Sequence, residues 1–161
     1  MRERCLAHGL KWRLDSPSRR YWLIQALLAP ALLSCLLVPI TRSGQDVEVV
    51  EVEARRGWQD SGVRAAAGDV LTITHVAGEW SPWPGESFDA LGSGGDPRCR
   101  CNVMQGVSHA ALLGRIGASS PFLVGGEYHR RVGESGPLEL RINDVDLNDN
   151  SGVLKVLIEV D

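Results

Sequence analysis

Oxygen-bearing side chains are concentrated in residues 143–152, which read Asn-Asp-Val-Asp-Leu-Asn-Asp-Asn-Ser-Gly. Three of them are carboxylates and three are amides. Carboxylates this close together repel one another, so the segment is costly unless a cation neutralises it. A set of oxygen ligands without histidine or thiolate favours Ca²⁺ over zinc or copper. The segment therefore predicts a calcium site.

The spacing Asp144-x-Asp146-x-Asn148 is shared with the start of an EF-hand loop. The EF-hand interpretation fails because Asp149 stands at the sixth position, where glycine is required, and Lys155 stands at the twelfth, where glutamate is required. The alternative is a solvated turn, since Asp and Asn are ordinary turn formers. Six such residues in ten favour the ion over the turn.

The elements that would hold this segment are short strands. Residues 46–54 alternate apolar and acidic side chains, which indicates a half-buried strand. Gly/Pro/Asn/Asp clusters separate the other apolar runs, and no ten-residue helical pattern occurs in the body. The sequence therefore predicts an all-β sandwich over 45–161, preceded by one N-terminal hydrophobic helix. Its other predicted strands are Val70–Val76 (ended by Ala77-Gly78), Ala110–Ile116, Phe122–Val124, Leu138–Ile142 and Val153–Val160.

The charge distribution indicates export. Residues 1–20 are basic, and six basic against two acidic residues give residues 1–40 a net charge of +4. The whole chain has a formal net charge of −3, so residues 41–161 carry −7. Positive charge stays on the cytoplasmic side of a membrane, which places the acidic body outside. An acidic body also argues against nucleic acid as a partner.

Residues 21–40 form an uncharged, largely apolar stretch, long enough to cross a bilayer. A transmembrane anchor is the favoured interpretation, with the domain in the periplasm or outside the cell. Cleavage near Ala29-Pro30-Ala31 and secretion is an alternative. The run 32–35 loosely resembles a lipobox, and the run 18–23 resembles a twin-arginine signal.

Cys99 and Cys101 are the two cysteines of the body. Two extended residues at this spacing hold their side chains well apart, so exposed loop thiols are predicted rather than a bridge between them. An intermolecular disulfide is the alternative in an oxidising compartment. No second pair of cysteines or histidines completes a zinc motif.

Four stretches of the body together resemble the PA-I type galactophilic lectins and related exported bacterial proteins. These stretches are Gly68–Ile73, Ala77–Ser81, Ala110–Gly117 and Ile142–Gly152. The resemblance implies a jelly-roll-like β-sandwich of the galactose-binding-domain kind that holds one Ca²⁺ at its end, with sugar hydroxyls completing the coordination.

The resemblance also implies roles for particular residues. Asp144 corresponds to the first carboxylate ligand, Asp149 and Asn150 to the closing pair, and the carbonyls near Leu147 and Trp83 to backbone ligands. The implied carbohydrate contacts are Asp144, Val145, Asp149, His109 and Trp83. The His-Pro-x-Gln run that contacts galactose in the family is absent from 81–108, so calcium is better supported than galactose.

Three hypotheses follow, and they differ in class. The first is a membrane-tethered, calcium-dependent carbohydrate-binding module. The second is a structural or protein-interaction domain that keeps calcium for rigidity alone. The third, a hydrolase using a pair such as Glu86 and Asp89, is least favoured because no catalytic motif is recognisable. The chain is therefore predicted not to be an enzyme, and Trp58 and Trp80 are predicted to fill the core.

Overall fold

The computed structural model describes residues 46–95 and 98–161. The basic segment 1–20 and the predicted anchor or signal segment 21–40 lie outside the described residues. Within the described part of the chain, no helix is long and apolar enough to cross a membrane.

Eight strands form two four-stranded antiparallel sheets, in the orders β1-β8-β3-β6 and β2-β7-β4-β5. The pairing is nested, because β1 pairs with β8, β2 with β7, β3 with β6 and β4 with β5, which is the arrangement of a jelly roll. The prediction of an all-β fold is confirmed. The strands are β1 (Asp46–Glu53), β2 (Gln59–Ala65), β3 (Val70–Ser81), β4 (Leu112–Ile116), β5 (Phe122–Leu123), β6 (Glu127–Arg131), β7 (Gly136–Ile142) and β8 (Ser151–Val160).

The core consists of the inward-facing side chains of both sheets. Alternate residues of β3, β7 and β8 are fully buried, as the two-residue period of a strand requires. Trp80 is also fully buried, as predicted, and its Nε1 donates to the carbonyl of Ala110 at 2.8 Å. The buried indole thus joins the end of β3 to the chain entering β4.

Strand β3 differs from its prediction because it does not end at Ala77-Gly78. The register shifts between His75 and Ala77, and pairing with β8 then continues as far as Ser81. Gly78 has φ +87°, and a Cβ built there would lie 2.2 Å from the carbonyl oxygen of Val153. Glycine at position 78 therefore lets β3 approach β8 closely just past the bulge, instead of ending the strand.

Two strands went unpredicted because their sequences lack an apolar alternation. β6 is an edge strand whose side chains are mostly exposed and charged. β2 alternates buried and exposed residues, but Ser61 takes one of the buried positions, and the register shifts between Asp60 and Arg64.

The prediction that Trp58 fills the core is wrong. It is half-buried and packs against a small separate cluster of Val107, Ala111 and Leu113. The guanidinium carbons of Arg115 and Arg141 lie 4.5 and 5.5 Å from the centre of its ring. A cation over an aromatic face is attracted to the ring, so two arginines from neighbouring strands hold Trp58 outside the core.

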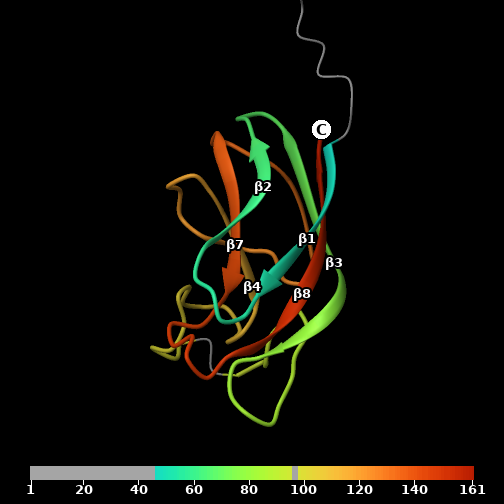
Figure 1. Cartoon of the computed structure of the whole chain (residues 1–161). Coiled ribbons are helices and arrows are strands. Elements are labelled where there is room, and N and C mark those ends of the chain that lie inside the picture. Colours follow the sequence, from blue (N-terminus) through green and yellow to red (C-terminus); the bar gives the residue numbers. More distant parts are fainter. Residues whose placement is uncertain (1–45, 96–97) are drawn as a thin grey trace, which may run out of the picture. The chain divides into compact units, whose positions relative to one another are not determined.

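The β7–β8 connection, which contains the oxygen-rich residues, lies at the same end of the sandwich as the long β3–β4 connection (Figure 1). Antiparallel nesting brings alternate connections to one end, so residues about forty positions apart become neighbours.

The Gly78→Ala substitution tests the close approach of β3 to β8. The added methyl group would clash with the Val153 carbonyl, and the alanine would have to adopt a left-handed backbone conformation. We therefore expect the free energy of unfolding to fall by about 2–4 kcal/mol. Urea denaturation measures it. In Gly133→Ala, where no atom lies within 4 Å of the added Cβ, the change should stay within about 0.5 kcal/mol. Equal effects of the two substitutions would contradict the role of the close approach.

Candidate metal and ligand site

Asn143 fixes the start of the β7–β8 connection. Its side chain is fully buried, and its Oδ1 accepts a hydrogen bond from the N–H of Met104 at 2.8 Å. Its Nδ2 donates to the carbonyls of Ser108 (3.0 Å) and Met104 (3.2 Å). Its backbone N–H donates to Ala111 at 2.8 Å. One asparagine therefore joins the end of β7 to the β3–β4 connection, a role that the sequence alone did not reveal.

The carboxylate of Asp144 lies next along the chain and is 3% exposed. Its Oδ1 accepts the N–H of Asp146 at 3.0 Å, and its Oδ2 lies 3.8 Å from Nε2 of His109. The backbone carbonyl of Asp144 accepts a hydrogen bond from Nη2 of Arg141 at 2.5 Å. Both the side chain and the backbone of Asp144 are thus held in place.

The pKa of Asp144 is raised above its ordinary value, chiefly because burial penalises the charged form. The N–H of Asp146, the positive charge of His109 and the side-chain amide of Asn150 act in the opposite direction, and the nearby carboxylate of Asp149 raises the pKa further. The ionised carboxylate is therefore short of positive charge, which a bound cation would supply.

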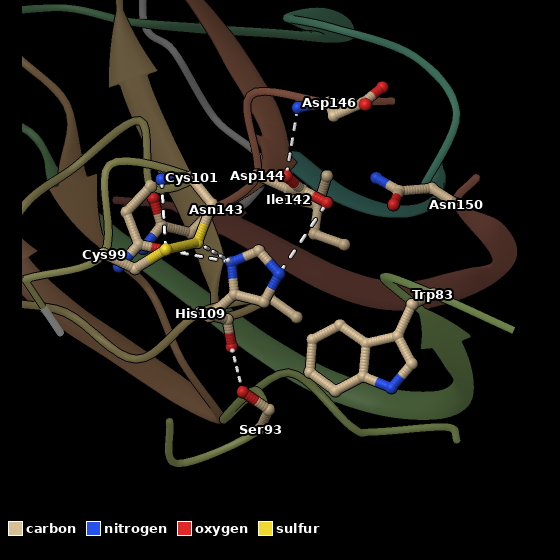
Figure 2. A network of polar contacts seen from close by, with 12 residues as sticks. Trp83, Ser93, Cys99, Cys101, His109, Ile142, Asn143, Asp144, Asp146 and Asn150 are labelled. Carbon is tan, nitrogen blue, oxygen red and sulfur yellow. Dashed lines mark hydrogen bonds and ion pairs between the residues drawn. A yellow bond between two sulfur atoms is a disulfide. The ribbon is translucent and has the colours of Figure 1, made fainter. Parts of the chain in front are cut away.

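The side chain of Asn150 is fully buried beside Asp144 (Figure 2). The Nδ2 of Asn150 donates to the carbonyl of Ala54 at 3.2 Å, and the backbone carbonyl of Asn150 accepts a hydrogen bond from Nε of Arg55 at 2.5 Å. Its Oδ1, however, has no hydrogen-bond partner, and it is the one such buried side-chain atom among the described residues. A buried acceptor without a partner costs about 1–3 kcal/mol, so this oxygen is suited to ligate an ion.

His109 lies beneath this pair, 7% exposed, with its ring parallel to that of Trp83 at a centroid distance of 5.4 Å (Figure 2). Nδ2 of Asn102 donates to Val107, so Oδ1 of Asn102 faces Nδ1 of His109 at 2.9 Å. Nδ1 therefore carries a hydrogen that it donates to Asn102, and Nε2 faces the carboxylate of Asp144.

The other predicted site residues are arranged less tightly. Val145 is 55% exposed, Asp149 is exposed, and Leu147 is half-buried against the core. The carbonyl of Trp83 accepts a hydrogen bond from the hydroxyl of Ser81 at 2.7 Å. The structure thus brings Asp144, Asn150, His109 and Trp83 together and leaves Val145 and Asp149 at the surface of the same connection.

Asp146 shows what an ordinary turn residue does in this segment. It is exposed, and its Oδ1 accepts both the N–H (3.1 Å) and the Nδ2 (2.9 Å) of Asn148. The solvated-turn interpretation therefore describes this half of the connection, whereas Asp144 and Asn150 are buried.

The prediction of free thiols at Cys99 and Cys101 is wrong, because the two residues form a disulfide. The prediction assumed an extended chain, but the segment turns: the N–H of Asn102 donates to the carbonyl of Cys99 at 3.0 Å. The turn reduces the Cα–Cα distance of the cysteines to 5.1 Å, within the range that a disulfide spans.

No group of three or more His, Cys, Asp and Glu side chains suited to a metal occurs in residues 46–95 and 98–161. An ion here would depend on a mixed set of carboxylate, amide and backbone oxygens. Ca²⁺ accepts such a set, whereas zinc and copper prefer nitrogen and sulfur. The unpartnered oxygen of Asn150 and the desolvated carboxylate of Asp144 therefore fit calcium.

No protein-family model matches the chain, and no curated protein matches it. Among solved structures, the chain is similar to one described as "EclA N-terminal domain; PllA-like lectin". The TM-score is 0.56 with 22% identity, over 70% of this chain and 95% of that one. The two share a fold. The fold is therefore one on which a lectin domain is built.

Replacing Asn143 by Ala tests the anchoring of the connection. It would leave the part-buried N–H of Met104 without its acceptor and remove the side-chain donor to the carbonyls of Met104 and Ser108, so we expect the free energy of unfolding to fall by about 3 kcal/mol. Chemical denaturation measures it. Asn148→Ala removes only an exposed turn contact and should cost less than about 1 kcal/mol. A small effect of Asn143→Ala would show that the two connections are held together by other contacts.

Proposed function

We propose that the chain is a calcium-dependent carbohydrate-binding module. The observation that carries the proposal is the buried Oδ1 of Asn150, which lacks a partner although its residue lies beside the desolvated carboxylate of Asp144. In the proposed site, Ca²⁺ is held by the side chains of Asp144, Asp149 and Asn150 and by the carbonyls of Leu147 and Trp83.

The charges of the connection support an ion at this position. A cation would stabilise the ionised form of Asp144, which burial disfavours, and would offset the repulsion from Asp149. Asp149 is exposed and has rotational freedom to turn towards an ion beside Asp144. Calcium coordination tolerates such a flexible, mixed ligand set.

Sugar binding is supported by the surroundings of that ion. Paired hydroxyls of a sugar are oxygen ligands and would fill the remaining coordination positions. Val145 and the indole of Trp83 border the same region and offer apolar contact to the carbon-bound face of a sugar ring. The ring of His109 stacks on the indole. The lectin whose fold is similar to this one is consistent with this class of ligand.

A location outside the cytoplasm is part of the proposal. The Cys99–Cys101 disulfide supports this location, because disulfides persist in oxidising compartments and are rare in the reducing cytosol. The charge distribution favours the same location, because a basic segment (1–20) and an apolar segment (21–40) precede an acidic body. Residues 21–40 would act as a membrane anchor or as a cleaved signal.

A second candidate is a calcium-stabilised domain that binds protein or serves structure alone. The surroundings of Trp83 favour it: His109 covers one face of the indole and Phe88 meets it edge-on at 5.7 Å, which leaves less of the ring for a sugar. Glycan binding distinguishes the two candidates, because both require the ion.

Calcium should stabilise the protein. Binding only to the native state adds about 2.7 kcal/mol when the free ion is at one hundred times its Kd, so the melting temperature should rise with Ca²⁺ and fall with chelator. Differential scanning calorimetry of the full-length protein in detergent measures both. Superimposable melting curves in the two conditions would contradict the calcium site.

Asp144→Asn removes one charge but keeps the size and one oxygen of the side chain, so we expect calcium affinity to fall by roughly tenfold or more. Isothermal titration measures the affinity. Asp146→Asn makes the same change two residues away, at an exposed turn residue, and should alter the affinity much less. If the two variants bind calcium equally well, the buried carboxylate is not a ligand.

Trp83→Ala separates the sugar from the ion. We expect glycan binding to weaken at every calcium concentration, because the apolar face is lost, whereas calcium affinity should change little, because the predicted ligand at this position is the backbone carbonyl. A glycan array with and without calcium, followed by titration of the best ligand, provides both measurements. Undiminished glycan binding by Trp83→Ala would remove the indole from the site, and a blank array would favour the second candidate.

A further inference from the structure

The Cys99–Cys101 disulfide closes a tight turn in the β3–β4 connection. Both cysteines are half-buried, and the N–H of Cys101 points to the sulfur of Cys99 at 3.2 Å. Nε2 of Gln105 donates to the carbonyls of Cys99 and Asn102, each at 3.0 Å. The turn is therefore held by a covalent bond together with backbone and side-chain hydrogen bonds.

Two contacts join this turn directly to the candidate site. The carbonyl of Cys101 accepts the N–H of Val145 at 2.8 Å, which fixes the residue that follows Asp144. The sulfur of Cys101 lies 3.4 Å from Nδ1 of His109 (Figure 2). One cysteine thus contacts both the oxygen-rich connection and the buried imidazole.

The imidazole of His109 lies between the turn and the proposed calcium ligand Asp144. Nδ1 of His109 is held by Asn102, the residue after Cys101, and Nε2 faces Oδ2 of Asp144 at 3.8 Å. The same ring stacks on Trp83. A shift of the turn would therefore move the His109 ring, which stacks on Trp83, and the Cys101 carbonyl, which accepts the N–H of Val145.

We propose that the Cys99–Cys101 disulfide is a positioning element of the calcium site, so that the oxidised protein binds calcium more tightly than the reduced protein. This inference rests on the proposed function. A crosslink between residues two apart closes a very short loop and removes little entropy from the unfolded chain. Its position against His109 and Val145 gives it a local role instead. Loss of a group that orients a metal ligand typically lowers metal affinity by 10–100-fold.

Reduction requires a dithiol. A thiolate of the dithiol attacks one cysteine sulfur, the S–S bond breaks, and the other cysteine leaves as a thiolate that takes up a proton. The second thiol of the dithiol then attacks the dithiol sulfur of the mixed disulfide and releases the first cysteine. Two electrons and two protons pass to Cys99 and Cys101, and the dithiol becomes a cyclic disulfide. The two thiols are then free to separate, and the turn can widen.

The test uses full-length protein in detergent with Cys5→Ser and Cys35→Ser, which leaves Cys99 and Cys101 as the sole cysteines. Calcium affinity is measured by titration before and after reduction with dithiothreitol and again after reoxidation. We expect affinity to fall roughly tenfold on reduction and to recover on reoxidation. Hydrogen exchange of the Val145 amide should speed up on reduction, because its acceptor is Cys101. A variant with both Cys99→Ser and Cys101→Ser, added to the same background, should bind calcium with the affinity of the reduced protein. Dithiothreitol should not change that affinity.

The outcomes separate this inference from the proposed function. Equal calcium affinities and unchanged Val145 exchange in the oxidised and reduced proteins would overturn the inference and leave the calcium site intact. Loss of cooperative melting on reduction would overturn it as well, because the disulfide would then hold the fold rather than the site. An oxidised protein that melts cooperatively but binds no calcium would overturn the proposed function, and the inference with it.

Discussion

The site depends on a carboxylate buried where β7 leaves the core. Asp144 follows the fully buried Asn143, whose side chain bonds to the neighbouring connection, and its own carboxylate accepts the N–H of Asp146. Burial raises its pKa, and the nearby oxygen of Asn150 has no donor. The energetic cost of this arrangement is explained if a cation occupies the site in the working protein.

The jelly-roll pairing makes that arrangement possible. Nested strands place the β3–β4 and β7–β8 connections at one end of the sandwich. There, His109 lies between Trp83 and Asp144, and the Cys99–Cys101 turn bonds to Val145. The sheets supply rigidity and the connections supply chemistry, a division found in many binding domains. The likeness to a lectin domain is one of fold, and the ligand itself is decided by the side chains at the site.

The sequence predicted the elements whose signal is local. Period-two alternation identified β1, and the apolar runs identified most of β3, β7 and β8. It also singled out Asp144 and Asn150, because their residue types are concentrated in one segment. It missed β6, whose charged residues form an edge strand.

The remaining features of the site arise from contacts between distant segments. The disulfide depends on a turn at 99–102, the burial of His109 depends on Trp83 and Asn102, and the place of Trp58 depends on two arginines from other strands. Residue types within any one of these segments do not specify such contacts.

A crystal structure of the oxidised protein grown with calcium tests the central claim most directly. The account predicts one ion with ligand distances of about 2.3–2.6 Å to the carboxylate of Asp144 and to Oδ1 of Asn150. Anomalous scattering would identify the ion. A structure at saturating calcium in which Oδ1 of Asn150 is bonded to a protein donor, with no ion beside Asp144, would contradict it.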